Sequence, residues 1–139
     1  MKHQTIELCF AQCRAALTAL GGWLGYFLGG TDGLLTALIV LSGLDYLTGV
    51  LCAVSEKKLS SAVGFRGVCR KALIFVLVGV GHVLDTRVAG SGAAMRTALI
   101  CFYLSNEGIS VLENVARLGL PVPERLKEAL RQLHGKEDA

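Results

Sequence analysis

Three ionisable side chains in this sequence interrupt long apolar stretches. Asp45, His82 and Glu107 are each surrounded by aliphatic and small residues. A carboxylate at the centre of a bilayer costs roughly 2.5–3.5 kcal/mol on insertion scales, so such a group is expected to face protein or water rather than lipid. Counted from the ends of their stretches, Asp45 and His82 lie at similar depth, so the two side chains could meet. The alternatives are a structural hydrogen bond for Asp45 and a packing role for His82.

A stripe of polar residues accompanies Glu107. The members recur at spacings of three and four residues, which places them on one face of a helix. Such an amphipathic helix either lies at the membrane surface or turns its polar face to a wet interior, and the pattern leaves both open. The predicted stripe consists of Asn106, Glu107, Ser110, Glu113, Asn114 and Arg117.

Three glycines near the N-terminus, Gly21, Gly25 and Gly29, repeat every fourth residue. Glycines at this spacing line one helix face and allow a second backbone to approach closely. We therefore predict that this face packs against another helix. The partner helix is either in the same protomer or in a second copy of the chain.

Enzyme chemistry is not indicated. The sequence shows no nucleophile–base pair, no phosphate-binding loop and no metal-ligand spacing, so we expect no catalytic residue, cofactor or metal. Five cysteines without a C-x-x-C pair are typical of small apolar residues in membrane helices. The net charge of +3, without aromatic–basic interleaving, does not favour nucleic acid as a partner.

Composition and hydropathy define the elements that must position these residues. The 139 residues are 53% hydrophobic and include 17 glycines, more apolar surface than a soluble domain of this size can bury. The sequence predicts one all-α integral membrane domain over residues 1–139. We expect about four hydrophobic helices, the fourth amphipathic, and a short charged helix in a cytoplasmic tail at 119–139. The predicted spans are residues 15–28, 34–54, 72–84 and 97–118, and the short third stretch is alternatively re-entrant.

Basic residues predict the orientation of these spans. Residues 55–71 are predicted to form a polar loop, and the tail carries further lysines and arginines. Lysine and arginine concentrate on the cytoplasmic side of membranes, so four spans with both termini inside satisfy the distribution. The predicted cytoplasmic basic loop carries Lys57, Lys58, Arg66, Arg70 and Lys71.

Several short motifs occur together in a characteristic order. They are DYLTG at 45–49, KLSS at 58–61, GFRG at 64–67, NEGISVLEN at 106–114 and GLPVP at 119–123. In order and spacing this set resembles the toxin-secretion/phage-lysis holin family of Gram-positive bacteria and their phages. The resemblance covers about residues 44–130.

The resemblance implies a multi-pass protein of the bacterial (host) cytoplasmic membrane. Such a protein assembles with copies of itself in the bilayer and opens lesions. An endolysin, or in some relatives a toxin, then passes as cargo without stable binding. Two other functions stay open: a small transporter or ion channel with an Asp–His–Glu relay at the midplane, and a membrane adaptor that recruits a partner through residues 124–134.

Overall fold

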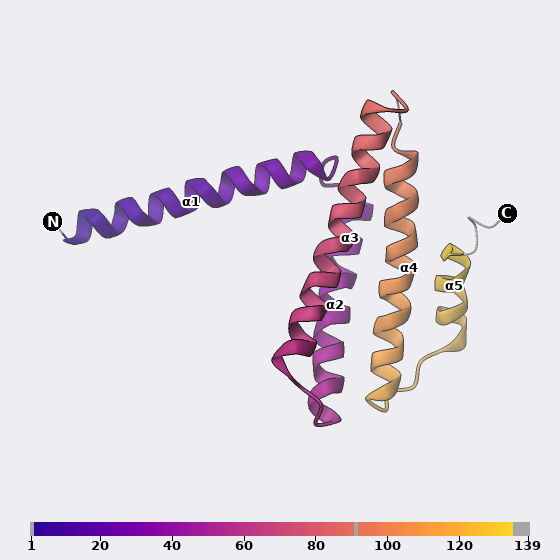
Figure 1. The fold of residues 1–139 in the computed structure, drawn as a ribbon. Helices are drawn as coiled ribbons and strands as arrows, with labels where there is room; N and C mark the ends of the chain where they lie inside the picture. The colour runs from indigo at the N-terminus through magenta and orange to yellow at the C-terminus, as the bar shows by residue number, and fades with distance from the viewer. Residues whose placement is uncertain (1, 91, 135–139) are drawn as a thin grey trace.

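The computed structural model describes residues 2–90 and 92–134 of the chain, and over these residues it is helical with short turns (Figure 1). The helices are α1 (Lys2–Phe27), α2 (Gly33–Ser55), α3 (Ser61–Arg87), α4 (Ala94–Arg117) and α5 (Glu124–His134). Residues 135–139 of the predicted cytoplasmic tail lie outside the described part. The all-helical expectation is confirmed.

Helices α2, α3 and α4 form a bundle in which α3 runs antiparallel to the other two, and α5 turns back along α4 (Figure 1). Helix α4 packs against α2, α3 and α5, whereas α2 and α3 touch each other little. Helix α1 projects sideways and contacts the bundle at α3. The amphipathic helix α4 is therefore the centre of the bundle and not a peripheral element.

Local capping explains where the helices begin. Asp32 accepts a hydrogen bond from the Leu35 amide at 2.8 Å, and Ser60 accepts one from the Val63 amide at 3.2 Å. Both are standard N-caps. Helix α4 has no side-chain cap from its preceding residue, Ala93. Its first amides are satisfied by a residue of α3, described below, so the start of α4 depends on tertiary structure.

Two helices begin earlier than the apolar stretches predict. The predicted polar loop at 55–71 ends at Ser60, because the Ser60 cap starts α3 well before its apolar stretch begins. The first helix likewise extends back to Lys2, far ahead of the stretch predicted from residue 15. Hydropathy locates apolar residues but not helix ends, because a helix continues through polar residues as long as its backbone hydrogen bonds are maintained.

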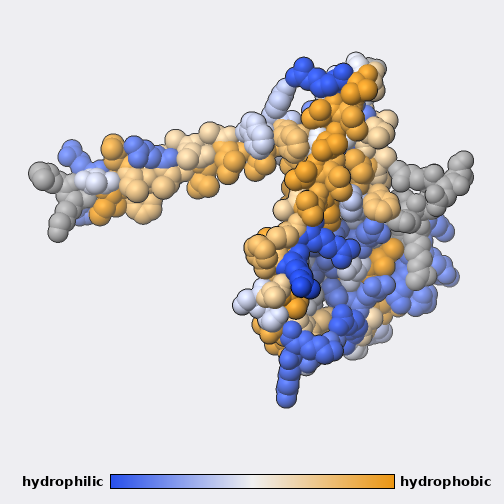
Figure 2. Space-filling view, viewed as in Figure 1, coloured by the Kyte–Doolittle hydropathy of each residue, from blue (hydrophilic) through white to orange (hydrophobic). Residues whose placement is uncertain are grey.

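Among the described residues, α2 and α3 are the two helices long and apolar enough to cross a membrane. Helices α1 and α4 do not reach that standard, so four spans remain an expectation. The apolar core of the bundle lies in the half nearer the α3–α4 turn, where Figure 2 shows a predominantly hydrophobic face. The core residues are Leu35, Leu38, Ile74, Val78 and Ile100.

Two glycines of α3 bring neighbouring helices close. A Cβ atom on Gly79 would overlap the Phe27 ring at the end of α1. A Cβ on Gly81 would lie 3.1 Å from the backbone of Arg96 in α4. These contacts fix the junction of α1, α3 and α4 at one end of the bundle.

Candidate functional site: a charge cluster between three helices

Halfway along the bundle, one lysine joins two carboxylates from different helices. Lys71 of α3 places its Nζ 2.5 Å from Oδ2 of Asp45 on α2, and it also pairs with the carboxylate of Glu107 on α4. The side chains of Asp45, Lys71 and Glu107 are 16%, 15% and 5% exposed. We call these three residues the charge cluster. It is the point at which α2, α3 and α4 are joined electrostatically.

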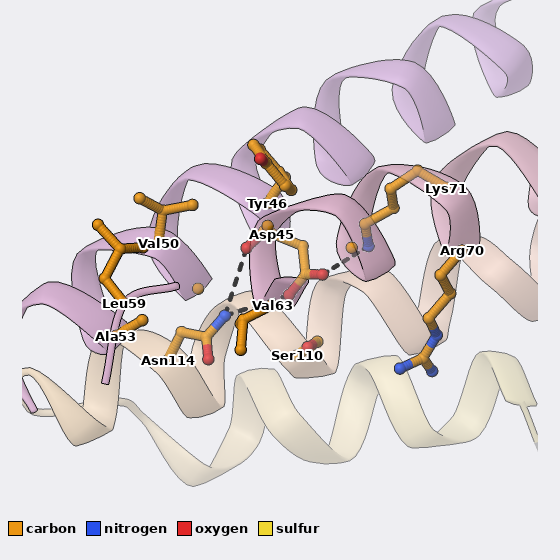
Figure 3. Close-up of a pocket in the computed structure, with 13 residues that line it drawn as sticks. Asp45, Tyr46, Val50, Ala53, Leu59, Val63, Arg70, Lys71, Ser110 and Asn114 are labelled. Atoms are coloured by element: carbon orange, nitrogen blue, oxygen red, sulfur yellow. Dashed lines mark hydrogen bonds and ion pairs between the residues drawn. The ribbon is translucent and has the colours of Figure 1, made fainter. Parts of the chain in front are cut away.

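Asn114, two turns further along α4, extends the cluster toward the α2–α3 turn. Its side-chain amide donates to Oδ1 of Asp45 at 3.1 Å (Figure 3). The same amide donates to the hydroxyl of Thr48, also at 3.1 Å. Its backbone carbonyl accepts from the buried thiol of Cys52 at 3.3 Å. Asn114 therefore satisfies its polar groups against α2, which holds this half of α4 to α2.

A cavity of about 240 Å³ opens beside the cluster, between α2, α3 and α4 (Figure 3). The two walls approach each other where the ring of Tyr46 lies over Gly64 and Gly67. The other lining residues shown in Figure 3 combine aliphatic side chains with the polar Asp45, Arg70, Lys71, Ser110 and Asn114. The polar face of α4 thus borders an open space within the bundle.

A second ionic assembly, which we call the clasp, lies near the α3–α4 turn. The buried Arg96 donates to Oδ2 of Asp32 at 2.5 Å and to the carbonyls of Leu28 and Gly30 at 2.6 and 3.0 Å. Asp85, 2% exposed, accepts from the amides of Met95 and Arg96 at 3.0 and 2.9 Å. The hydrogen bond from Arg96 is the main cause that lowers the pKa of Asp32. The clasp ties the α1–α2 turn and α3 to the start of α4.

The predicted polar stripe is divided by the fold. Glu107 and Asn114 are buried and face α2 and α3, while Asn106 and Ser110 are half-buried. Glu113 is exposed, and Arg117 pairs at the surface with Glu56. The bundle therefore brings together Asp45, Glu107 and Asn114 from the predicted set.

His82 does not contact Asp45, although their similar predicted depths in the membrane had left such a contact possible. It lies on α3 against Gly29 and beside a small cavity formed with the end of α1. Lys71 occupies the place beside Asp45 instead. The depth estimate failed because α3 begins earlier than predicted and presents Lys71, not His82, at the level of Asp45.

Two other predicted sets, the helix-packing glycines and the basic loop residues, also require correction. Gly29 lies beyond the end of α1 with φ +81°, so it serves a turn and not a helix face. Gly21 and Gly25 stay on α1, where nothing in the described chain lies within 4 Å of an added Cβ. Among the predicted loop cations, Lys57 and Lys58 lie in the turn, whereas Arg66, Arg70 and Lys71 belong to α3.

Sequence reasoning missed the inward role of Lys71 and the whole clasp. From hydropathy alone, the Lys71 side chain would be expected to reach toward the lipid headgroups. Because Lys71 directly precedes the apolar run, it could equally well contact an acidic residue of a neighbouring helix. Arg96 and Asp85 flank the glycine-rich turn at 88–93, and their opposite charges were the available signal. Within the described ranges there is no group of three or more potential ligands that could hold a metal ion.

Comparison with known proteins identifies a family that this sequence matches. The bacteriophage holin family matches residues 22–135. A 14.9 kDa protein from the region 3′ of nagH in Clostridium perfringens is 43% identical over 121 residues, 87% of this chain and 92% of that protein. The Bacillus subtilis protein YqxH is 35% identical over 113 residues, 81% of this chain and 79% of its own length.

A relative from a phage carries a functional name. A protein of Bacillus phage phi105, named as a probable holin, is 34% identical over 104 residues, which cover 75% of this chain and 76% of that protein. No solved structure matches. The family match spans most of the chain, including all of the bundle and the cluster. The chain therefore belongs to the bacteriophage holin family, whose members are membrane proteins and not enzymes.

Proposed function

We propose that this chain is a holin: it accumulates in the bacterial cytoplasmic membrane, assembles with copies of itself and opens lesions for an endolysin or a toxin. The observation that supports this most directly is the buried polar face of α4. Glu107 and Asn114 are 4% and 8% exposed inside a bundle whose other two helices are apolar enough to span. A protein stored in lipid has to hide such groups, because each exposed charge is costly there.

The outer surface of the bundle suits lipid. Leu73, Val76 and Val80 on α3, and Ile39 and Leu47 on α2, are all more than 40% exposed. Contiguous apolar surface of this kind marks contact with a membrane or another protein. In the closed protomer these hydrophobic side chains thus face outward, and the charge cluster faces inward. An assembly that turned the α4 faces of many copies toward one another would line a space with polar side chains and allow water to enter.

Helix α1 is the element we assign to assembly. Gly21 and Gly25 have no neighbour within the described chain, so a side chain there would not disturb the protomer. We expect Gly25→Leu to leave folding unchanged and to delay or abolish lysis, because it keeps neighbouring backbones apart. Gly43→Leu on α2, which also has nothing within 4 Å, is the matched control. Equal delays in both variants would remove α1 from assembly.

The function is tested by co-expression with an endolysin that lacks a signal sequence. Membrane potential and release of a cytoplasmic enzyme are followed in the same cells. A holin gives low permeability while it accumulates, then an abrupt loss of potential together with enzyme release. Gradual ion leakage with the enzyme retained would instead indicate the transporter.

The adaptor function is tested by deleting residues 124–139. If α5 recruits a cytoplasmic partner, this deletion abolishes function in cells whereas changes at Glu107 do little. If the chain is a holin, the truncated protein still lyses cells, and the Glu107 variants shift the onset of lysis. The measurement is the onset of lysis with the truncated and full-length proteins at equal expression.

The proposed orientation places both termini and the 56–60 turn in the cytoplasm. Reporters fused after Glu56 and after Ala139 should both read cytoplasmic, and one at Gly90 in the α3–α4 turn should read external. An external C-terminus would contradict the four-span arrangement and favour an interfacial α4.

A further inference from the structure

Lys71 is, among the described residues, the basic side chain that contacts the acids of the charge cluster. Its helix, α3, touches α2 little, and Lys71 adds an ion pair to the contact that Tyr46 makes with Gly64 and Gly67 one to two turns away. Glu107 on the central helix α4 is held by the same ammonium group. One side chain therefore connects the three helices at the middle of the bundle.

The cluster is not balanced in charge. Two carboxylates share one ammonium, so the ionised cluster carries one excess negative charge in a site that is mostly shielded from solvent. Removing one acid charge leaves a one-to-one pair with Lys71. Removing the lysine charge leaves two acids from different helices without a basic partner, and the Asn114 amide, a neutral donor, contacts Asp45 alone. Two uncompensated carboxylates are strongly unfavourable in a low dielectric.

We propose that Lys71 is a latch that holds α4 closed between α2 and α3, and that the excess carboxylate of the cluster sets the onset of opening. The effect of the latch on lysis rests on the proposed function, whereas the latch itself is a property of the single protomer. It follows that acid and base variants of the cluster act in opposite directions. A cluster that served packing alone would be weakened by either change.

Four variants test this asymmetry. Lys71→Met removes the ammonium and keeps an unbranched side chain that is one heavy atom shorter. Asp45→Asn and Glu107→Gln each remove one negative charge and keep shape, and the amide oxygen introduced at position 45 can still accept the hydrogen bond from Asn114. Arg66→Met is the control, because it removes the same charge from an exposed position on the same helix and leaves the cluster intact.

The first readout is the onset of lysis at equal expression beside an endolysin. The latch predicts that Lys71→Met triggers earlier than the unmodified protein and that Asp45→Asn and Glu107→Gln trigger later. Arg66→Met should keep the unmodified onset. If Lys71→Met fails to accumulate, the two acid variants still decide the matter, because early or unchanged onset in both overturns the latch.

The second readout does not depend on lysis. Cys52 is 2% exposed at the α2–α4 contact, with its thiol bonded to the Asn114 carbonyl, so its alkylation reports separation of α4. The assay uses the purified full-length chain in phosphatidylglycerol–phosphatidylethanolamine vesicles, with Cys9, Cys13, Cys69 and Cys101 changed to alanine. We expect Cys52 to react at least about tenfold faster in Lys71→Met than in Arg66→Met, and more slowly in the acid variants.

The two readouts separate the two proposals. An unmodified chain that does not lyse cells, with Cys52 rates in the expected order, would defeat the proposed function and leave the latch standing. Abrupt lysis by the unmodified chain, with the same Cys52 rate and the same onset in all four variants, would overturn the latch alone. Slower Cys52 labelling in Lys71→Met than in Arg66→Met would overturn it as well.

Discussion

The clasp near the α3–α4 turn and the charge cluster at mid-bundle each join three parts of the chain through one basic residue and two acids, but they differ in what compensates the second acid. In the clasp, Arg96 pairs with Asp32, while Asp85 binds the two amides at the start of α4. A helix N-terminus carries partial positive charge, so Asp85 has compensation of its own. In the cluster, Asp45 and Glu107 share Lys71.

This difference assigns distinct mechanical roles to the two sites. The clasp is electrically satisfied and holds backbone carbonyls as well as side chains, so it should keep the end of the bundle closed. The cluster has Lys71 as its basic partner for two acids, with the neutral Asn114 amide as a further donor to Asp45. Opening should therefore begin at the middle of α4 and spread toward the α2–α3 turn, with the clasp as the fixed end.

Arg96→Met should have the largest effect, because it breaks the fixed end. The buried guanidinium donates hydrogen bonds to Asp32 and to two carbonyls around the α1–α2 turn, and its loss leaves these acceptors without it. Each hydrogen bond from a charged donor contributes about 1.5–3 kcal/mol, so we expect a loss of about 3–5 kcal/mol in unfolding free energy, measured by thermal unfolding in detergent. Arg87→Met, an exposed basic residue at the end of α3, is the control. Equal melting of the two variants would contradict the role of the clasp.

Gly81→Val should come next, since it separates α3 from α4 beside the clasp. The added Cβ would lie 3.1 Å from backbone atoms of Arg96, which cannot rotate away as a side chain can. Overpacking of this kind typically destabilises by about 1–3 kcal/mol. Gly43→Val introduces the same residue on α2, where nothing lies within 4 Å. The comparison is made by thermal unfolding, and similar values for both would mean that α3 and α4 tolerate more separation than the structure shows.

Asn114→Ala should weaken the contact between α4 and α2 next to the charge cluster and leave the clasp intact. It removes the hydrogen bonds to Asp45 and Thr48, for an expected loss of about 1–2 kcal/mol. Alkylation of Cys52 should accelerate, whereas protease resistance of the α3–α4 turn should not change. Glu113→Ala, at the exposed neighbouring position, should change neither. A protected Cys52 in Asn114→Ala would show that the amide does not hold α4 to α2.

The smallest effect concerns acid pH. The pKa of Asp32 is lowered below its ordinary 3.8 chiefly by the hydrogen bond from Arg96. The stabilisation from ionised Asp32 is therefore fully present above pH 3.8 and is lost as pH falls through the lower folded value. Because half of the side chain is exposed, the loss should be modest.

Asp32→Asn tests this pH dependence, since asparagine keeps the N-cap of α2. Its unfolding temperature should lie below that of the unmodified chain by a constant amount from about pH 5 to 8. The two curves should approach each other below the ordinary pKa of the carboxyl. A gap that widened toward low pH would have the wrong sign for this explanation.

Hydropathy and spacing were sufficient for the features that depend on neighbours along the chain. The apolar run at 34–54 falls within α2, and the turn after the first helix falls where Gly29 and Gly30 allow positive φ. The three-and-four spacing predicted one polar stripe on the helix that became α4, and the fold buries Glu107 and Asn114 from it while Glu113 stays exposed. Hydropathy failed at residues 61–71, because an N-cap and backbone hydrogen bonds can maintain a helix through a basic segment.

The sequence alone thus located the apolar parts of the helices, but not the helical residues at 2–14 and 61–71, and it predicted that Asp45 and Glu107 avoid lipid. Only the tertiary structure decided that Lys71, and not His82, faces Asp45, and that Asp85 caps a helix that lacks a cap of its own. The physical reason is that helix formation and hydropathy are properties of residues a few positions apart. The partner of a buried charge depends on the relative rotation and axial register of three helices, which are set by the packing of residues far apart in the chain.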